Sequence, residues 1–166
     1  MATNYERAFA ARPEVYEAWG RLNGAVKAGM DPRRYELVTF AAAQRLRSSY
    51  CSLAHGLVLR DRFGEPVLEI AEDRRSADLD EVDLAVMDLA ERVVDDAASI
   101  GESDLQRLRE LGLSEPELMD VVLAAAARCF FSKTLDALGV LPDASYREVD
   151  AELRDALVVG RPIADD

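Results

Sequence analysis

The only histidine of the chain, His55, follows Cys51 by four residues, and Cys51 is one of two cysteines. Residues four apart lie on one face of a helix, so the thiol and the imidazole would be neighbours. A thiol attacks as a thiolate, and a helix N-terminus, an imidazole or a cation such as Arg47 favours that form. An imidazole titrates near neutral pH and can accept the thiol proton. The spacing therefore predicts a nucleophilic thiol with its own base.

Two further polar residues belong to this hypothesis. Ser48 lies one turn before Cys51 and would share its helix face if it caps or begins that helix. Glu36 stands at the start of a mostly apolar run, where an unpaired carboxylate is costly to bury, so it either points to solvent or has a polar partner. If the chain folds back at Ser48, Glu36 would approach Cys51 as the third member of a proton relay.

The same residues also have structural interpretations. Free cysteines are among the most buried residue types, and a lone histidine is often a satisfied core residue. Cys129 has apolar neighbours and is interpreted as structural, although a role as resolving thiol stays open. One histidine, one nearby cysteine and a distant glutamate are too few ligands for a tight metal site, and the glycines form no phosphate-binding loop. Neither a metal nor a cofactor is expected.

Helices must position these residues, because strand signals are few and Ala, Leu, Glu and Arg predominate. We predict an all-α, single-domain bundle of about six or seven helices. Trp19 is interpreted as a core residue of the first helix, and Cys51 falls in or near the first turn of its own. The predicted helices begin near Pro13, Pro32, Cys51, Asp78, Asp104 and Ser114, with a partly helical stretch after Arg147.

The length of the chain limits its domain organisation, and its charge limits its possible partners. Residues 1–146 are predicted to form the helical domain, and residues 147–166 a helical extension that frays from Gly160 into an acidic tail without chemistry. The 166 residues carry 20 Lys and Arg against 32 Asp and Glu, and a net charge of −12 repels nucleic acid and anionic lipid. No apolar run approaches the roughly 20 residues of a membrane span, and signal-peptide features are missing. We expect a cytoplasmic protein without nucleic-acid or membrane partners.

The segment Ser-Ser-Tyr-Cys-Ser-Leu-Ala-His-Gly over residues 48–56, preceded by Glu36, resembles a known signature. It is similar to the Glu…Cys-x-x-Cys-x-x-x-His pattern of the alkylhydroperoxidase D-like and carboxymuconolactone decarboxylase superfamily, and the likeness extends over most of the chain. The resemblance implies an all-α fold that assembles as dimers, trimers or hexamers, with the motif beneath a partly apolar pocket. It implies that Cys51 attacks a peroxide while His55 and Glu36 relay protons. Ser48 stands in place of the resolving cysteine.

The leading expectation is therefore a thiol-dependent, peroxidase-like antioxidant oxidoreductase. Because Ser48 cannot form the intramolecular disulfide of a two-cysteine cycle, an oxidised Cys51 would need an external thiol reductant, or Cys129 if it lies close.

Two alternatives remain at the level of the sequence. The decarboxylase branch implies a cofactor-free lyase or isomerase on a small lactone or keto acid, in which His55 and Glu36 would do acid and base work. The candidates to bind the carboxylate of such an organic acid are Arg45, Arg47 and Arg128. The other alternative is a non-catalytic helical oligomer of the same family.

Overall fold

The computed structural model describes residues 2–165, and this range is helical without strands, which confirms the predicted fold class. Met1 and Asp166, the ends of the two predicted segments, lie outside it. None of the helices described is both long and apolar enough to cross a membrane. The helices are α1 (Asn4–Phe9), α2 (Pro13–Gly29), α3 (Pro32–Arg45), α4 (Ser49–Phe63), α5 (Val67–Asp73), α6 (Glu81–Asp96), α7 (Glu102–Glu110), α8 (Glu115–Ala137) and α9 (Ala151–Leu157), with 3₁₀ turns at Ala97–Ser99 and Ala144–Glu148.

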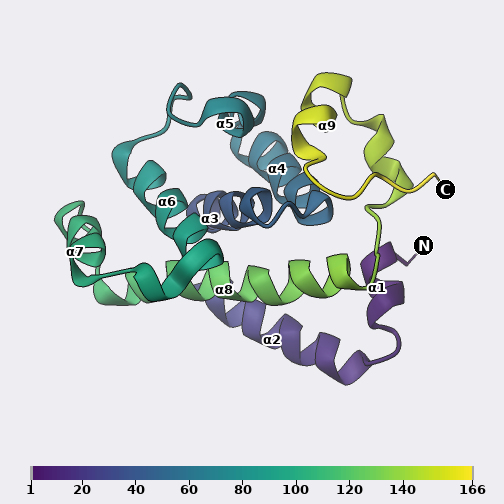
Figure 1. The fold of residues 1–166 in the computed structure, drawn as a ribbon, viewed down its shortest axis with the longest axis horizontal. Helices are drawn as coiled ribbons and strands as arrows, with labels where there is room; N and C mark the ends of the chain where they lie inside the picture. Colours follow the sequence, from purple (N-terminus) through teal and green to yellow (C-terminus); the bar gives the residue numbers. More distant parts are fainter. Residues whose placement is uncertain (1, 166) are drawn as a thin grey trace.

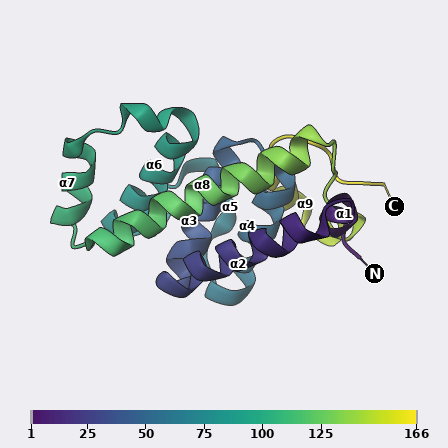
Figure 2. The same cartoon turned by 90° about the horizontal axis from the view of Figure 1, so that it is seen from below.

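Helix α3 is the central element of the fold. Its residues 35–43 are all buried, because α4, α6 and α8 pack around it. The long helix α8 crosses the molecule beneath α3, and α2 lies along α8 (Figure 1). Figure 2 shows α2 and α8 from below, running beside one another. A motif on α4 is thus enclosed by α3 on one side and by α2 and α8 on another.

Local capping sets several helix starts, as the sequence predicts. The Asp31 carboxylate accepts a hydrogen bond from the Arg34 amide at 2.9 Å at the start of α3. Ser114 forms a capping box with Glu117 at the start of α8. These side chains satisfy amides that the helix itself leaves unpaired.

The turn between α3 and α4 has a left-handed residue that is not glycine. Arg47 has a φ of 56°. Its amide donates to the carbonyl of Gln44, and the Ser48 amide donates to the carbonyl of Ala43, each at 3.0 Å. This pair of bonds is the Schellman arrangement that ends a helix. The turn aims the chain directly into α4, and Cys51 follows within one turn.

The C-terminal segment packs over this turn, so the expected fraying at Gly160 is wrong. The Gly160 amide donates to the Ser49 hydroxyl at 2.8 Å, and Ile163 and Ala164 are buried. A Cβ atom on residue 160 would lie 1.9 Å from the Arg47 carbonyl oxygen. The chain therefore needs glycine here to approach the start of α4 closely.

Candidate active site

Cys51 lies in the first turn of α4, and its side chain is 2% exposed. Ser48 is the N-cap residue: its carbonyl accepts from the Ser52 amide at 2.9 Å, but its hydroxyl makes no capping hydrogen bond. That hydroxyl is buried and finds no hydrogen-bond partner within residues 2–165. Ser48 thus starts the helix of Cys51 through its backbone and brings no polar contact to the thiol.

Cys51 and His55 line the same pocket, which has a volume of about 650 Å³ and is called the Cys51 pocket below. Its walls come from α1, α2, α4 and α8, and they combine aromatic side chains with the polar side chains of Glu17, Arg21, Asn23 and Arg128. The aromatic side chains that line it are Tyr5, Tyr16, Trp19, Tyr50 and Phe131. A pocket of this size and lining is typical of a site for a small organic molecule.

Glu36 contacts His55 from the side away from the pocket. The Oε2 atom of Glu36 lies 2.5 Å from Nδ1 of His55, and the Thr39 hydroxyl lies 3.2 Å from the same nitrogen. The chain does fold back between α3 and α4 as the hypothesis required. It brings Glu36 against the imidazole, however, and Glu36 is not among the residues that line the Cys51 pocket.

Burial and charge fix the ionisation of this pair. Burial, and next the positive charge of Arg128, lower the pKa of His55 to about 4, although Glu36 acts in the opposite direction. Burial raises the pKa of Glu36, but His55 and Lys27 together outweigh it and hold that pKa below its usual value. At neutral pH the imidazole is therefore neutral and Glu36 is a carboxylate. The Nδ1 proton is donated to Glu36, which leaves Nε2 free to accept a proton.

Arg128 of α8 is the cation that meets the thiol. Its Nη1 atom donates to Cys51 Sγ at 3.6 Å, and its Nη2 atom donates to the Tyr35 hydroxyl at 3.3 Å. The side chain is buried between Trp19 and Phe131, with its guanidinium carbon 5.7 Å and 5.6 Å from the two ring centroids. A buried positive charge therefore lies beside the sulfur atom.

The other two arginine candidates lie elsewhere. Arg45 pairs with Asp95 on α6, and Arg47 donates to the Val159 carbonyl at 3.1 Å. Neither lines the Cys51 pocket. Their expected role in binding a substrate carboxylate is therefore not supported by their positions.

Comparison with known proteins decides the relationship. Residues 13–92 match the Carboxymuconolactone decarboxylase family, and this range contains Glu36, Ser48, Cys51 and His55. This part of the chain is therefore similar to the Carboxymuconolactone decarboxylase family. The predicted resemblance is thereby confirmed.

Two solved structures share the fold of this chain. One, described as an alkylhydroperoxidase AhpD core and an uncharacterized peroxidase-related protein from Ralstonia eutropha JMP134, superposes with a TM-score of 0.79 at 22% identity, covering 97% of this chain and 84% of that one. Another, an uncharacterized peroxidase-related protein from Silicibacter sp. TM1040, has a TM-score of 0.81 at 22% identity, with 89% and 80% covered. A comparison with curated proteins found no match.

The aromatic lining was missed by the sequence reasoning, which began the first helix at Pro13. Tyr5 of α1 packs edge-on against Tyr50 and Phe131, with centroids 5.6 Å and 5.7 Å away. Trp19 is buried as predicted, and it also lines the pocket. The signal that could have found α1 is its capping box, in which Thr3 and Glu6 satisfy each other's amides.

Cys129 does not take the place of the superfamily's resolving cysteine at the Cys51 pocket. It is half-buried on α8 and is not among the residues that line the pocket. Burial raises the pKa of its thiol. Both cysteines are free thiols.

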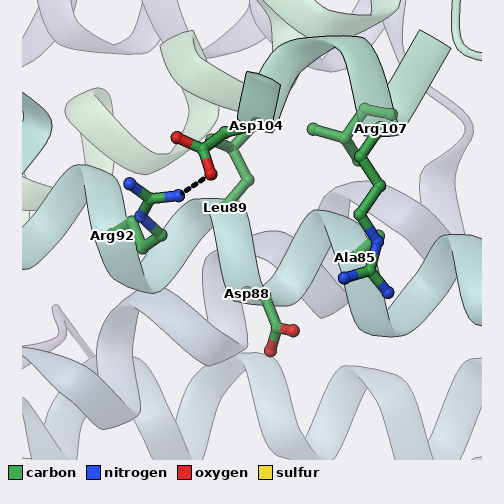
Figure 3. A pocket seen from close by; sticks show the side chains of 7 residues that line it. Ala85, Asp88, Leu89, Arg92, Asp104 and Arg107 are labelled. Carbon is green, nitrogen blue, oxygen red and sulfur yellow. Dashed lines mark ion pairs between the residues drawn. The ribbon is translucent and has the colours of Figure 1, made fainter. Parts of the chain in front are cut away.

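Outside the Cys51 pocket, the residues described offer little for a reaction. No group of three or more His, Cys, Asp and Glu side chains suited to a metal occurs among the residues described. A pocket of about 160 Å³ lies between α6 and α7, where Arg92 pairs with Asp104 (Figure 3). Its lining is ion-paired and has no nucleophile or base of the Cys-His kind, so the Cys51 pocket is the better candidate for a reaction.

Proposed function

We propose that the protein is a thiol-dependent peroxidase that reduces an organic hydroperoxide through Cys51. The observation that carries this proposal is the buried contact of 3.6 Å between the Arg128 guanidinium and Cys51 Sγ, in a pocket shared with His55. The similarity of residues 13–92 to the Carboxymuconolactone decarboxylase family, together with the resemblance of residues 48–56 to the alkylhydroperoxidase D-like signature, supports a peroxidase-related role. Both solved neighbours are described as peroxidase-related, which agrees with it at the level of the fold.

The chemical step uses the two faces of the imidazole. Nε2 of His55 accepts the thiol proton, directly or through a water molecule, while Glu36 holds Nδ1. The thiolate attacks the terminal oxygen of the hydroperoxide, so that an S–O bond forms and the O–O bond breaks. The alkoxide leaves and takes the proton from Nε2. The products are a sulfenic acid on Cys51 and an alcohol: the sulfur is oxidised and the peroxide is reduced.

An external thiol completes the cycle in this proposal. Its sulfur attacks the sulfenic acid, which releases water and leaves a mixed disulfide with Cys51. A second thiol then attacks the external sulfur, frees Cys51 and carries away the disulfide. Ser48 has no sulfur to resolve the intermediate, and Cys129 lies outside the pocket lining.

Turnover of an organic hydroperoxide with a small thiol as reductant tests the proposal. Cys51→Ser is expected to abolish turnover, His55→Ala to slow it about 100-fold, which is a typical cost of losing a general base, and Cys129→Ser to leave it unchanged. Turnover that survives Cys51→Ser would overturn the proposal.

The lyase alternative makes the opposite prediction for Cys51→Ser, because acid and base chemistry on a lactone or keto acid needs no thiol. Turnover of a lactone or keto acid would survive Cys51→Ser and fail in His55→Ala. Two arginines line the pocket: Arg128 is engaged by Cys51 and Tyr35, and Arg21 pairs with Glu17 at 3.1 Å.

A further inference from the structure

Glu36 lies between two pockets rather than at the end of a closed relay. Its Oε2 atom contacts His55 at 2.5 Å, and its Oε1 atom lies 3.5 Å from Nζ of Lys27. Lys27 and Glu36 line a separate pocket of about 210 Å³ with Pro32, Tyr35 and Arg62, called the rear pocket here. One carboxylate oxygen thus faces the imidazole, and the other faces a cation at the opposite side.

The wall between the two pockets is thin and polar. His55 lines the Cys51 pocket and Glu36 lines the rear pocket, so the hydrogen bond between them joins the two. Tyr35 completes the wall: its hydroxyl accepts from Arg128 beside the thiol, while Nζ of Lys27 lies 4.6 Å from its ring centroid.

We propose that the rear pocket is the solvent port of the proton relay, and that Lys27, whose Nζ atom lies 3.5 Å from Oε1, is the residue that positions Glu36 there. The inference rests on the proposed function. When an organic hydroperoxide fills the Cys51 pocket and displaces its water, the relay contacts water only on the Glu36 side. As Nε2 takes the thiol proton, Nδ1 passes its own proton to Oε2 of Glu36, which exchanges with water in the rear pocket. The reverse transfer restores Nδ1 after Nε2 has protonated the alkoxide.

Charges reach the relay from each packed element. Lys27 approaches from α2, Tyr35 from α3, Arg62 from the last turn of α4, and Arg128 from α8. The charge of Lys27 contributes to the lowered pKa of Glu36, after burial and His55, and to the lowered pKa of His55, after burial and Arg128. Because a positive charge disfavours the imidazolium form, its removal must raise the pKa of His55.

The single histidine makes this inference measurable by proton NMR titration of the imidazole. The variants are Lys27→Met, Lys27→Arg and Lys133→Met, since Lys133 is the other lysine of the chain and is exposed on α8. We expect the pKa of His55 to rise by about one in Lys27→Met, as for the loss of a neighbouring charge. Lys27→Arg and Lys133→Met should match wild type. Equal pKa values in Lys27→Met and Lys133→Met would overturn the role of Lys27.

A second readout tests the port itself. The acid limb of the rate of Cys51 oxidation by an organic hydroperoxide should move to higher pH in Lys27→Met by the same amount as the pKa of His55, and return in Lys27→Arg. If the pKa of His55 rises in Lys27→Met but the acid limb of the oxidation rate stays at the same pH, the proposed port is wrong. Wild-type protein that fails to react with the peroxide would overturn the proposed function and the port with it, while the NMR titration would still decide the effect of Lys27.

Discussion

A buried guanidinium is stable only where neighbouring groups share its charge. Arg128 has two hydrogen-bond acceptors, Cys51 Sγ and the Tyr35 hydroxyl, and its Nε atom finds no partner within the part of the chain that the structure describes. The thiol is therefore a main partner of this charge. In turn, Arg128 is the residue through which α8 contacts the cysteine on α4.

Replacement of Arg128 should lower the reactivity of that cysteine. In a Cys129→Ser background, alkylation of Cys51 by iodoacetamide at pH 7 is expected to slow at least about 10-fold in Arg128→Met, because the thiolate loses its neighbouring cation. Arg45→Met removes an exposed arginine paired with Asp95 and serves as the matched control. Equal alkylation rates in the two variants would contradict the assigned role of Arg128.

The buried neutral state of His55 also predicts how stability depends on pH. The folded-state pKa of about 4 lies below the ordinary value of 6.5, so the unfolded chain binds a proton first as pH falls. This penalty is absent above pH 6.5 and complete near pH 4, and it is on the order of 3 kcal/mol. Urea unfolding at pH 7 and pH 5 should show the loss in wild type and a smaller loss in His55→Gln. An equal loss in both proteins would refute the neutral state.

Sequence reasoning at this scale found residue pairs that local geometry fixes. Cys51 and His55 share a face because a four-residue spacing in a helix demands it. The contacts of Glu36 with His55 and of Arg128 with Cys51 join residues of different helices, and no local pattern specifies which side chains meet there. The structure was needed to show that Glu36 lies behind the imidazole, outside the pocket of the thiol.

At the scale of the elements, the turn between α3 and α4 sets the position of the start of α4, which carries Cys51. Gly160 fits against the carbonyl of Arg47, so a side chain at residue 160 would push the C-terminal segment away from the start of α4. The segment after α9 is thus part of the support for Cys51, contrary to the expectation of a frayed end.

Gly160→Ala tests this contact. We expect it to lower the free energy of unfolding by about 1–3 kcal/mol, as overpacking does, and to alter the reactivity of Cys51 as the start of α4 shifts. Gly24→Ala is the control, because residue 24 lies within α2 and a Cβ there meets no atom within 4 Å. That change should stabilise the helix by about 0.5–1 kcal/mol. If both variants unfolded at the same urea concentration, the contact of residue 160 with the Arg47 carbonyl would not contribute to stability.

Helices with local start signals were predictable, and those that depend on tertiary contacts were not. Asp31 and Ser114 are N-cap residues of types that predict a helix start, and α3 and α8 begin directly after them. The missed helices are α1 and α5, which have six and seven residues. Helices so short gain little from propensity, and α1 is held by aromatic packing on α4 and α8 that the sequence does not reveal.

At the scale of the whole molecule, an apolar face of α8 lies open to solvent. Met119, Leu123 and Phe130 recur at helical spacing and are 59%, 39% and 46% exposed. Contiguous exposed apolar residues of this kind are typical of an interface between proteins. We propose that copies of the chain bury this face against one another, as the resemblance implies. The cytoplasmic location stays a prediction.

Sedimentation tests the assembly. Wild-type protein at micromolar concentration should sediment as more than the 18.3 kDa monomer, and Leu123→Glu should shift it toward monomer because a charge is costly in an apolar interface. Gln106→Glu adds the same charge on the exposed surface of α7 and should leave the assembly intact. A wild-type protein that is only monomeric at this concentration would contradict the proposed interface.

The proposed function depends above all on Cys51, which attacks the peroxide after His55 has accepted its proton. The most direct measurement is the second-order rate constant for oxidation of Cys51 by an organic hydroperoxide in a Cys129→Ser background, with free cysteine as the reference. We expect a rate constant well above that of free cysteine, and we expect His55→Ala to lower it about 100-fold. A rate constant equal to that of free cysteine and unchanged by His55→Ala would contradict the proposed function.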